Sequence, residues 1–183
     1  QQLVDQKMAH PILIGRKEVI LDGISALGLD MKASEDFTLV DPNTYEKMDE
    51  YSDKLYELRK RKGVTRDEAG IIMLRRWATL GAMMVRLGHA DGMVAGLTGK
   101  FKKFLHQAEQ VLEKKDNVSK MYAMQVVMRE GKVYFITDTH INNETLTSED
   151  LAEVSLLASE MVKKLNIEPR VALLSHSSFG SDD

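Results

Sequence analysis

Near the start of the chain, short apolar runs alternate with one helical segment, and this order limits the possible folds. Residues 12–15 and 37–40 are short apolar runs, and residues 17–27 between them place apolar side chains at helical spacing. Gly28 follows as a helix stop signal. Short buried runs alternating with amphipathic helices are typical of parallel sheets covered by helices. The pattern therefore predicts an α/β fold.

Two long helices are expected next, near 43–62 and 66–87. Each begins with a capping-box pattern, in which a helix-capping residue precedes an acid by three positions. The two pairs are Asn43 with Glu46 and Thr65 with Glu68.

The second half predicts a further strand at 91–95, a glycine-bearing loop at 96–99 and a helix over 100–113. A hairpin is then expected from 121–128 and 132–137, because Gly131 ends a short turn between two apolar runs. Such a hairpin allows antiparallel pairing in a mostly parallel sheet, which makes the sheet mixed.

A long amphipathic helix with its own cap is expected near the end of the chain. Thr147 and Asp150 predict its start, and the helix is expected to run to about Leu165 with Asn166 as its stop. Residues 171–174 then form a short apolar run that predicts a last strand.

Composition excludes several classes of function. The 183 residues are 43% hydrophobic, enough for two small cores, although we expect a single compact domain. With 25 Lys and Arg against 28 Asp and Glu, no positive field is available for nucleic acid. No apolar run approaches the roughly 20 residues of a membrane helix. The absence of cysteine excludes disulfides and thiolate chemistry, and we expect a cytoplasmic protein.

Three loops follow predicted strands and form the candidate site, over 96–99, 138–143 and 175–181. Ligands bind at the carboxyl edge of open α/β sheets, where backbone N–H groups are free. Glycine lets backbone approach an anion, and hydroxyls add donors. The alternative is that these are ordinary turn residues. The residues that carry the anion interpretation are Gly96, Gly99, Gly180, Thr98, Ser175, Ser177 and Ser178.

Other chemical signals are weaker. His140 lies near Asp138, and His176 lies among serines, but no zinc motif accompanies either histidine. Residues 175–178 lack the flanking glycines of a nucleophile elbow. The basic run 59–62 ends a predicted helix, where interaction with the helix dipole explains part of it, and the charge pattern alone favours a solvated face.

Three stretches resemble the phosphate acetyltransferase (phosphotransacetylase) family: 56–65, 91–96 and 167–175. Within that family, the stretches 96–101, 138–142 and 176–181 are most similar to the phosphotransacetylase-like C-terminal region of bacterial NADP-dependent malic enzymes, in which a catalytic malate domain comes first. The similarity extends in order over essentially the whole chain.

The resemblance implies a three-layer α/β/α sandwich of two lobes. The chain is then a partial phosphotransacetylase-like domain over 1–183, with its first strand and second lobe missing. Arg59 matches an arginine that holds the anionic groups of coenzyme A in the enzymes. His106 stands where the enzymes carry a second arginine, Ala95 replaces a loop serine, and the catalytic Ser-Arg pair belongs to the second lobe.

The resemblance thus implies a ligand site without catalytic or metal-binding residues. The expected contacts to acetyl-CoA or phosphate are Arg59, Gly96, Thr98, Gly99, His106, Asp138, His140, Ser175, Ser177, Ser178, Gly180 and Ser181.

The function implied is an acetyl-CoA-sensing regulatory and oligomerisation domain of an NADP-dependent malic enzyme, with no acetyl transfer of its own. Acetyl-CoA or a related CoA ester is the expected effector. The malate domain of the same polypeptide is an expected partner, holding NADP and a divalent metal, and a second copy makes a homo-oligomer. The first alternative is a fragment of an active phosphate acetyltransferase. The second is a structural dimerisation module in which helices 66–87 and 148–165 bury apolar faces.

Overall fold

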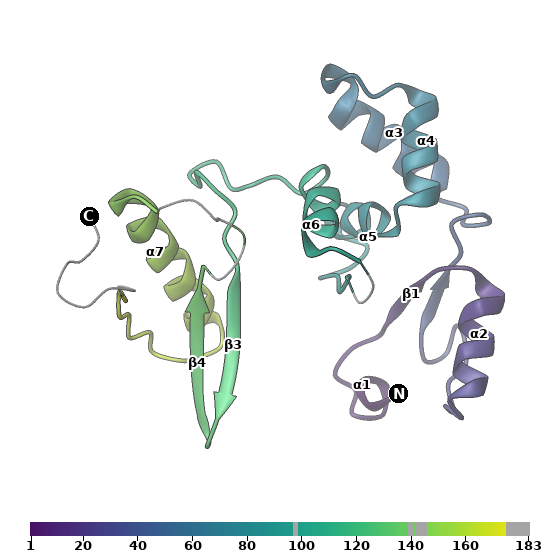
Figure 1. Ribbon diagram of the computed structural model, residues 1–183. Helices are drawn as coiled ribbons and strands as arrows, with labels where there is room; N and C mark the ends of the chain where they lie inside the picture. The colour runs from purple at the N-terminus through teal and green to yellow at the C-terminus, as the bar shows by residue number, and fades with distance from the viewer. Residues whose placement is uncertain (97–98, 139–140, 142–145, 175–183) are drawn as a thin grey trace. The chain divides into compact units, whose positions relative to one another are not determined.

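The computed structural model describes all residues except 97–98, 139–140, 142–145 and 175–183. The chain forms two compact units, and the single domain over 1–183 stays a prediction. Unit 1 comprises residues 1–113 and unit 2 residues 114–183. In Figure 1 unit 1 runs from purple to teal and unit 2 from green to yellow. Helices and small sheets occur in both units, which confirms the mixed α/β class.

Unit 1 begins with a short helix and a parallel strand pair. Its elements are α1 (Gln2–Asp5), β1 (Ile12–Ile14), α2 (Lys17–Ala26) and β2 (Thr38–Val40). Leu13 lies opposite Leu39 in the parallel register. After α2, Gly28 adopts a positive φ of 62°, the conformation of a helix stop. The predicted strand-helix-strand start is confirmed.

The rest of unit 1 is helical. Its elements are α3 (Met48–Arg59), the short 3-10 helix η1 (Lys60–Lys62), α4 (Arg66–Arg75), α5 (Trp77–Arg86) and α6 (Phe101–Glu109). Thr65 and Glu68 form the predicted capping box at the start of α4. The core of unit 1 is a cluster of buried apolar side chains: Val40, Tyr51, Leu55, Ala69, Met73, Leu80, Ala82, Met83, Met84 and Val111.

Three expectations for unit 1 are wrong. The helix predicted from 43 begins at Met48, because the Asp41 carboxylate accepts from the Asn43 amides and holds a turn there. The single helix predicted over 66–87 is interrupted at Arg76, whose φ and ψ are −111° and 82°. Residues 91–95, all described, form no strand.

Unit 2 contains a hairpin and a long helix. The strands β3 (Met124–Arg129) and β4 (Lys132–Thr137) pair antiparallel, as predicted. The turn residues Glu130 and Gly131 both have positive φ, which matches the twist of a tight hairpin. Helix α7 (Ser148–Lys164) begins with the predicted capping box of Thr147.

The end of α7 also follows the prediction, but the next segment does not. Asn166, just past the helix, has a φ of 58°. Residues 171–174, all described, form no strand. No helix in the described part of the chain is long and apolar enough to cross a membrane. Because the described residues of each unit form one two-stranded sheet, the three-layer sandwich stays a prediction.

Candidate functional site

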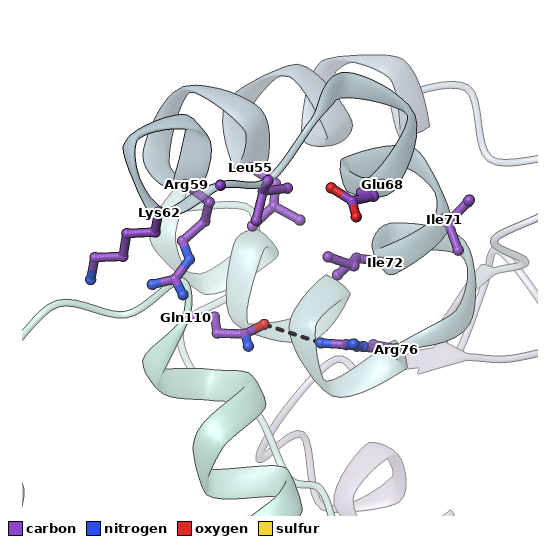
Figure 2. A pocket seen from close by; sticks show the side chains of 10 residues that line it. Leu55, Arg59, Lys62, Glu68, Ile71, Ile72, Arg76 and Gln110 are labelled. Atoms are coloured by element: carbon purple, nitrogen blue, oxygen red, sulfur yellow. Dashed lines mark hydrogen bonds between the residues drawn. The ribbon is translucent and has the colours of Figure 1, made fainter.

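A hollow of about 340 Å³ opens in unit 1 beside Arg59. Its wall comes from the end of α3, the turn into α4, α4 itself and Gln110 just after α6 (Figure 2). We call it the Arg59 hollow. It is lined by Leu55, Arg59, Lys62, Gly63, Val64, Glu68, Ile71, Ile72, Arg76 and Gln110.

The Arg59 hollow carries excess positive charge. Arg59, Lys62 and Arg76 line it, and none of them has a carboxylate partner among the described residues. The neighbouring cations differ, since Lys60 pairs with Glu57 and Arg66 lies 2.5 Å from Asp53. These exposed pairs keep their own charges balanced, whereas the lining cations remain available to a ligand.

Among the residues that the structure describes, Glu68 is the one acid that lines the hollow, and it is already engaged. Its carboxylate accepts from the Thr65 backbone N–H at 2.9 Å and from the Thr65 hydroxyl at 3.0 Å. These hydrogen bonds, the backbone one first, lower the pKa of Glu68, so the carboxylate is charged at neutral pH. Three cations against one acid leave the hollow positive overall.

The hollow also has an apolar side. Leu55 is fully buried, Val64 and Ile72 are half-buried, and Ile71 is about half exposed at 54%. Guanidinium groups offer forked N–H donors that match phosphate and carboxylate oxygens. The arrangement therefore suits an anionic ligand that also has an apolar part.

His106 is joined to the Arg59 hollow through Gln110. The Gln110 amide nitrogen donates to His106 Nε2 at 3.1 Å, and its oxygen accepts from Arg76 at 3.4 Å. In Figure 2 Gln110 lies between the side chains of Arg59 and Arg76. The structure thus brings two of the predicted residues, Arg59 and His106, to one region. His106 itself is exposed and does not line the hollow.

The predicted glycines Gly96 and Gly99 lie close to the Phe104 ring and do not line the hollow. Gly96 and Gly99 have φ of 109° and 119°, a region that side chains disfavour. A Cβ on Gly99 would lie 3.1 Å from the Phe104 ring, and one on Gly96 would lie 3.6 Å from it. The absence of a side chain lets the backbone at Gly96 and at Gly99 lie close to Phe104 of α6. Their contact with a ligand stays a prediction.

Asp138 belongs to unit 2 and directly follows β4, as expected. Its carboxylate accepts from the Ala123 backbone N–H at 3.0 Å. The remaining predicted contacts lie outside the described residues: Thr98, His140, Ser175, Ser177, Ser178, Gly180 and Ser181. Because 91–95 and 171–174 are not strands, the derivation of one shared sheet edge is wrong for two of the three loops. That the three loops contact one ligand stays a prediction.

Unit 2 has a second hollow, of about 250 Å³, between the hairpin and α7. It is mostly apolar, and its lysines are already engaged. Lys120 lies 2.8 Å from Asp150, Lys115 lies 3.4 Å from Glu160, and Lys114 donates to the Ser119 carbonyl. The Arg59 hollow is therefore the better anion site.

A family model described as phosphate acetyl/butaryl transferase matches residues 1–183, the whole chain. The chain belongs to this family. NADP-dependent malic enzymes from Escherichia coli strain K12 and Haemophilus influenzae strain Rd are 40% and 41% identical to it over all of its length. The chain spans 24% of each of those enzymes.

A solved phosphotransacetylase gives the structural comparison. The crystal structure of a phosphotransacetylase from Streptococcus pyogenes matches with a TM-score of 0.83 and 31% identity. The match covers all of this chain and 54% of that one. The chain therefore has the phosphotransacetylase fold over about half of a complete phosphotransacetylase chain, and the family resemblance drawn from the sequence is confirmed.

Sequence reasoning missed most residues around Arg59 in this member of the transferase family. Lys62 lies within a basic run that the helix dipole explains in part. Arg76 falls in the middle of a predicted continuous helix, and Gln110 carries no signal of its own. Only the apolar pattern of α4 could have pointed to the side of the hollow formed by Ile71 and Ile72.

Proposed function

We propose that this chain is the acetyl-CoA-sensing regulatory and oligomerisation region of an NADP-dependent malic enzyme. The 40% identity to the Escherichia coli enzyme over the full chain supports this assignment. Its partners are then a malate domain in the same polypeptide and a second copy of the protein. The complete polypeptide converts malate to pyruvate and CO₂ while reducing NADP. We place NADP and a divalent metal in that domain, outside this chain, and the protein in the cytoplasm.

The observation that carries the proposal is the Arg59 hollow. Acetyl-CoA has several phosphate charges together with an adenine ring and a thioester arm of low polarity. Arg59 and its neighbouring cations meet the phosphates, and Ile71 and Ile72 offer apolar contact. The other predicted contact residues, and the three-layer sandwich of the whole domain, are part of the same proposal.

The proposed region binds acetyl-CoA without transferring the acetyl group. Acetyl transfer to phosphate requires cations that gather two anions and stabilise the developing oxyanion. Removing one such donor costs about 2.7 to 4 kcal/mol of barrier. His106 occupies the position of the second arginine that the family resemblance implies. In this proposal the chain therefore keeps the binding cation Arg59 and lacks one of the arginines used in catalysis.

Regulation then follows from linkage. A ligand that binds one global state of an enzyme more tightly than another shifts the population toward the first state. The coupling is reciprocal, so malate-site ligands change the affinity for acetyl-CoA by the same factor. Acetyl-CoA is the effector in this proposal, and damping of malate oxidation is the expected response.

The test is calorimetric titration of the complete polypeptide with acetyl-CoA. Arg59→Gln is expected to weaken binding about ten- to hundredfold, the range for a lost charge-assisted hydrogen bond. Arg61→Gln is the matched control, because Arg61 is exposed on η1 and does not line the hollow. Absence of acetyl-CoA binding by the unmodified protein rejects the proposal.

The second candidate is part of an active phosphate acetyltransferase, which the match to the Streptococcus pyogenes phosphotransacetylase favours. In that reaction a phosphate oxygen attacks the thioester carbonyl, the carbon-sulfur bond breaks, and acetyl phosphate and the CoA thiolate form. Turnover of acetyl-CoA and phosphate by the complete polypeptide, abolished by Arg59→Gln, supports this candidate over the first.

A further inference from the structure

The interruption between α4 and α5 has no compositional cause. Proline and glycine are the residues that usually break helices. The break falls at Arg75, Arg76 and Trp77, and none of these is proline or glycine. The break is nevertheless well formed. The Arg76 N–H donates to the Ile72 carbonyl at 2.8 Å, and the Arg76 carbonyl accepts from the Thr79 N–H at 2.8 Å. Arg76 thus ends one helix and begins the next.

The consequence of the break is the position of one guanidinium. Arg76 lines the Arg59 hollow, whereas its neighbour Arg75 does not. Gln110 accepts from Arg76 and is itself hydrogen-bonded to His106. Figure 2 shows the Arg59 and Arg76 side chains entering from different sides of the hollow. The site therefore offers two guanidinium forks, one from the end of α3 and one from the α4-α5 break.

The charges at the site define the ligand class. Two guanidiniums and the Lys62 amine face one engaged carboxylate, that of Glu68, which leaves an excess of two positive charges. A single carboxylate or a monoanionic acyl group leaves one fork unused. A diphosphate group carries at least two charges and has oxygens on both phosphorus atoms, so it can accept from both forks together.

We propose that Arg76 is a specificity-determining residue that binds one phosphate of a diphosphate-bearing ligand while Arg59 binds the other. Gln110 is a positioning residue for Arg76, because its side-chain oxygen accepts a hydrogen bond from the Arg76 guanidinium. The inference deepens the proposed function, since it rests on the Arg59 hollow as the ligand site, and it names the diphosphate as the group that the hollow selects.

The experiment measures binding of inorganic pyrophosphate and of acetate to the complete polypeptide by calorimetry. Arg76→Gln is expected to lower pyrophosphate affinity about ten- to hundredfold, with Arg76→Lys between it and the unmodified protein. Arg75→Gln is the control and leaves the affinity unchanged. Acetate is expected to bind weakly to every variant. Pyrophosphate binding that is undetectable, or equal in the Arg76→Gln and unmodified proteins, overturns the proposal.

The positioning role of Gln110 has its own readout. Gln110→Glu keeps the shape and the hydrogen bond to Arg76 but adds a negative charge beside the guanidinium. Its pyrophosphate affinity is expected to fall by more than that of Gln110→Ala, and to depend less steeply on salt than that of the unmodified protein. A residue with a merely structural role gives the opposite order, with Gln110→Ala the more damaging change, and that order rejects the role.

An acetyl-CoA titration separates this inference from the proposed function. Acetyl-CoA binding that depends on Arg59 but not on Arg76 leaves the function standing and rejects the inference. If pyrophosphate binding depends on Arg76 but the protein does not bind acetyl-CoA, the inference stands and the proposed function is rejected. Hydrogen exchange across α4 and α5 verifies that each variant is folded. If Arg76→Gln unfolds, the pyrophosphate affinity of Arg76→Lys tests the inference in its place.

Discussion

The Tyr51 hydroxyl and His89 Nδ1 are hydrogen-bonded at 2.5 Å, which joins a buried residue of α3 to the segment that follows α5. Tyr51 is fully buried, and its ring also lies 5.9 Å from that of Tyr45. Burial raises the pKa of Tyr51, so its hydroxyl stays protonated. This contact fixes the start of the segment that leads to the predicted glycine loop.

Tyr51→Phe is expected to lower the free energy of unfolding by about 1 kcal/mol, because the ring packing survives and one hydrogen bond is lost. Urea denaturation followed by Trp77 fluorescence measures the change. Tyr56→Phe is the control. The Arg66 guanidinium carbon lies 4.4 Å from the centre of the Tyr56 ring, and the Tyr56 hydroxyl is not needed for that contact. Equal losses in the two variants contradict the interpretation.

Acid is expected to destabilise unit 2 through Asp150. The Lys120 ammonium, 2.8 Å away, and then the Thr147 backbone N–H hold the pKa of Asp150 below its usual value. A carboxyl whose pKa is lower in the folded state stabilises the fold above the unfolded-state pKa. That stability is lost as the pH falls through the folded-state pKa. The loss therefore begins below about pH 4, the usual aspartate range.

Urea denaturation followed by circular dichroism from pH 7 to pH 3 measures this dependence. Asp150→Asn is expected to be less stable than the unmodified chain at pH 7 and to show a shallower acid slope. Asp116→Asn is the control, since exposed Asp116 forms no ion pair in the described part of the chain. An unchanged slope in Asp150→Asn means that other carboxyls carry the acid response.

Two glycine substitutions are expected to act in opposite directions. Gly99→Ala places a Cβ 3.1 Å from the Phe104 ring at a φ of 119°. It should cost at least about 1 kcal/mol. Gly70→Ala, within α4 and with nothing within 4 Å of its Cβ, should gain about 0.5 to 1 kcal/mol. Thermal denaturation of both variants checks the pair, and a neutral Gly99→Ala shows that the loop relaxes away from α6.

Local signals predicted the elements that local chemistry builds. The hairpin of unit 2 depends on a two-residue turn with positive φ at Glu130 and Gly131, and the sequence marks it with a glycine. The α4 and α7 starts depend on a side chain three residues from its partner, as in Thr65 with Glu68. Such contacts are encoded within one turn of chain, so sequence alone is sufficient to find them.

Elements that depend on distant partners were not predictable in this way. A run such as 171–174 becomes a strand only where another strand pairs with it, and apolar composition alone does not supply that partner. The Asn43 pattern failed because Asp41 competes for the Asn43 amides. Arg59 entered the candidate site only through the family resemblance. Arg76 at the α4-α5 break and Gln110 just after α6 come together across the fold, which periodicity does not reveal.

The segment that carries Gln110 is held by Arg86, and this contact gives the last prediction. The Arg86 guanidinium donates to the Val111 carbonyl at 2.9 Å and to the Glu113 carboxylate at 3.1 Å. The Glu113 side chain is 71% exposed, so water screens that ion pair. The carbonyl contact is less exposed and depends on the guanidinium alone. Arg86 therefore stabilises this segment mainly through its hydrogen bond to the backbone.

Arg86→Met keeps an apolar stem of similar length and removes both contacts. It is expected to cost about 1 to 2 kcal/mol and to speed hydrogen exchange in residues 110–113. Glu113→Gln is expected to stay within about 0.5 kcal/mol of the unmodified protein, because only the screened ion pair is lost. Hydrogen-exchange mass spectrometry and urea denaturation measure both effects. A Glu113→Gln loss as large as that of Arg86→Met contradicts the prediction, since the ion pair would then carry the stability that we attribute to the Val111 carbonyl.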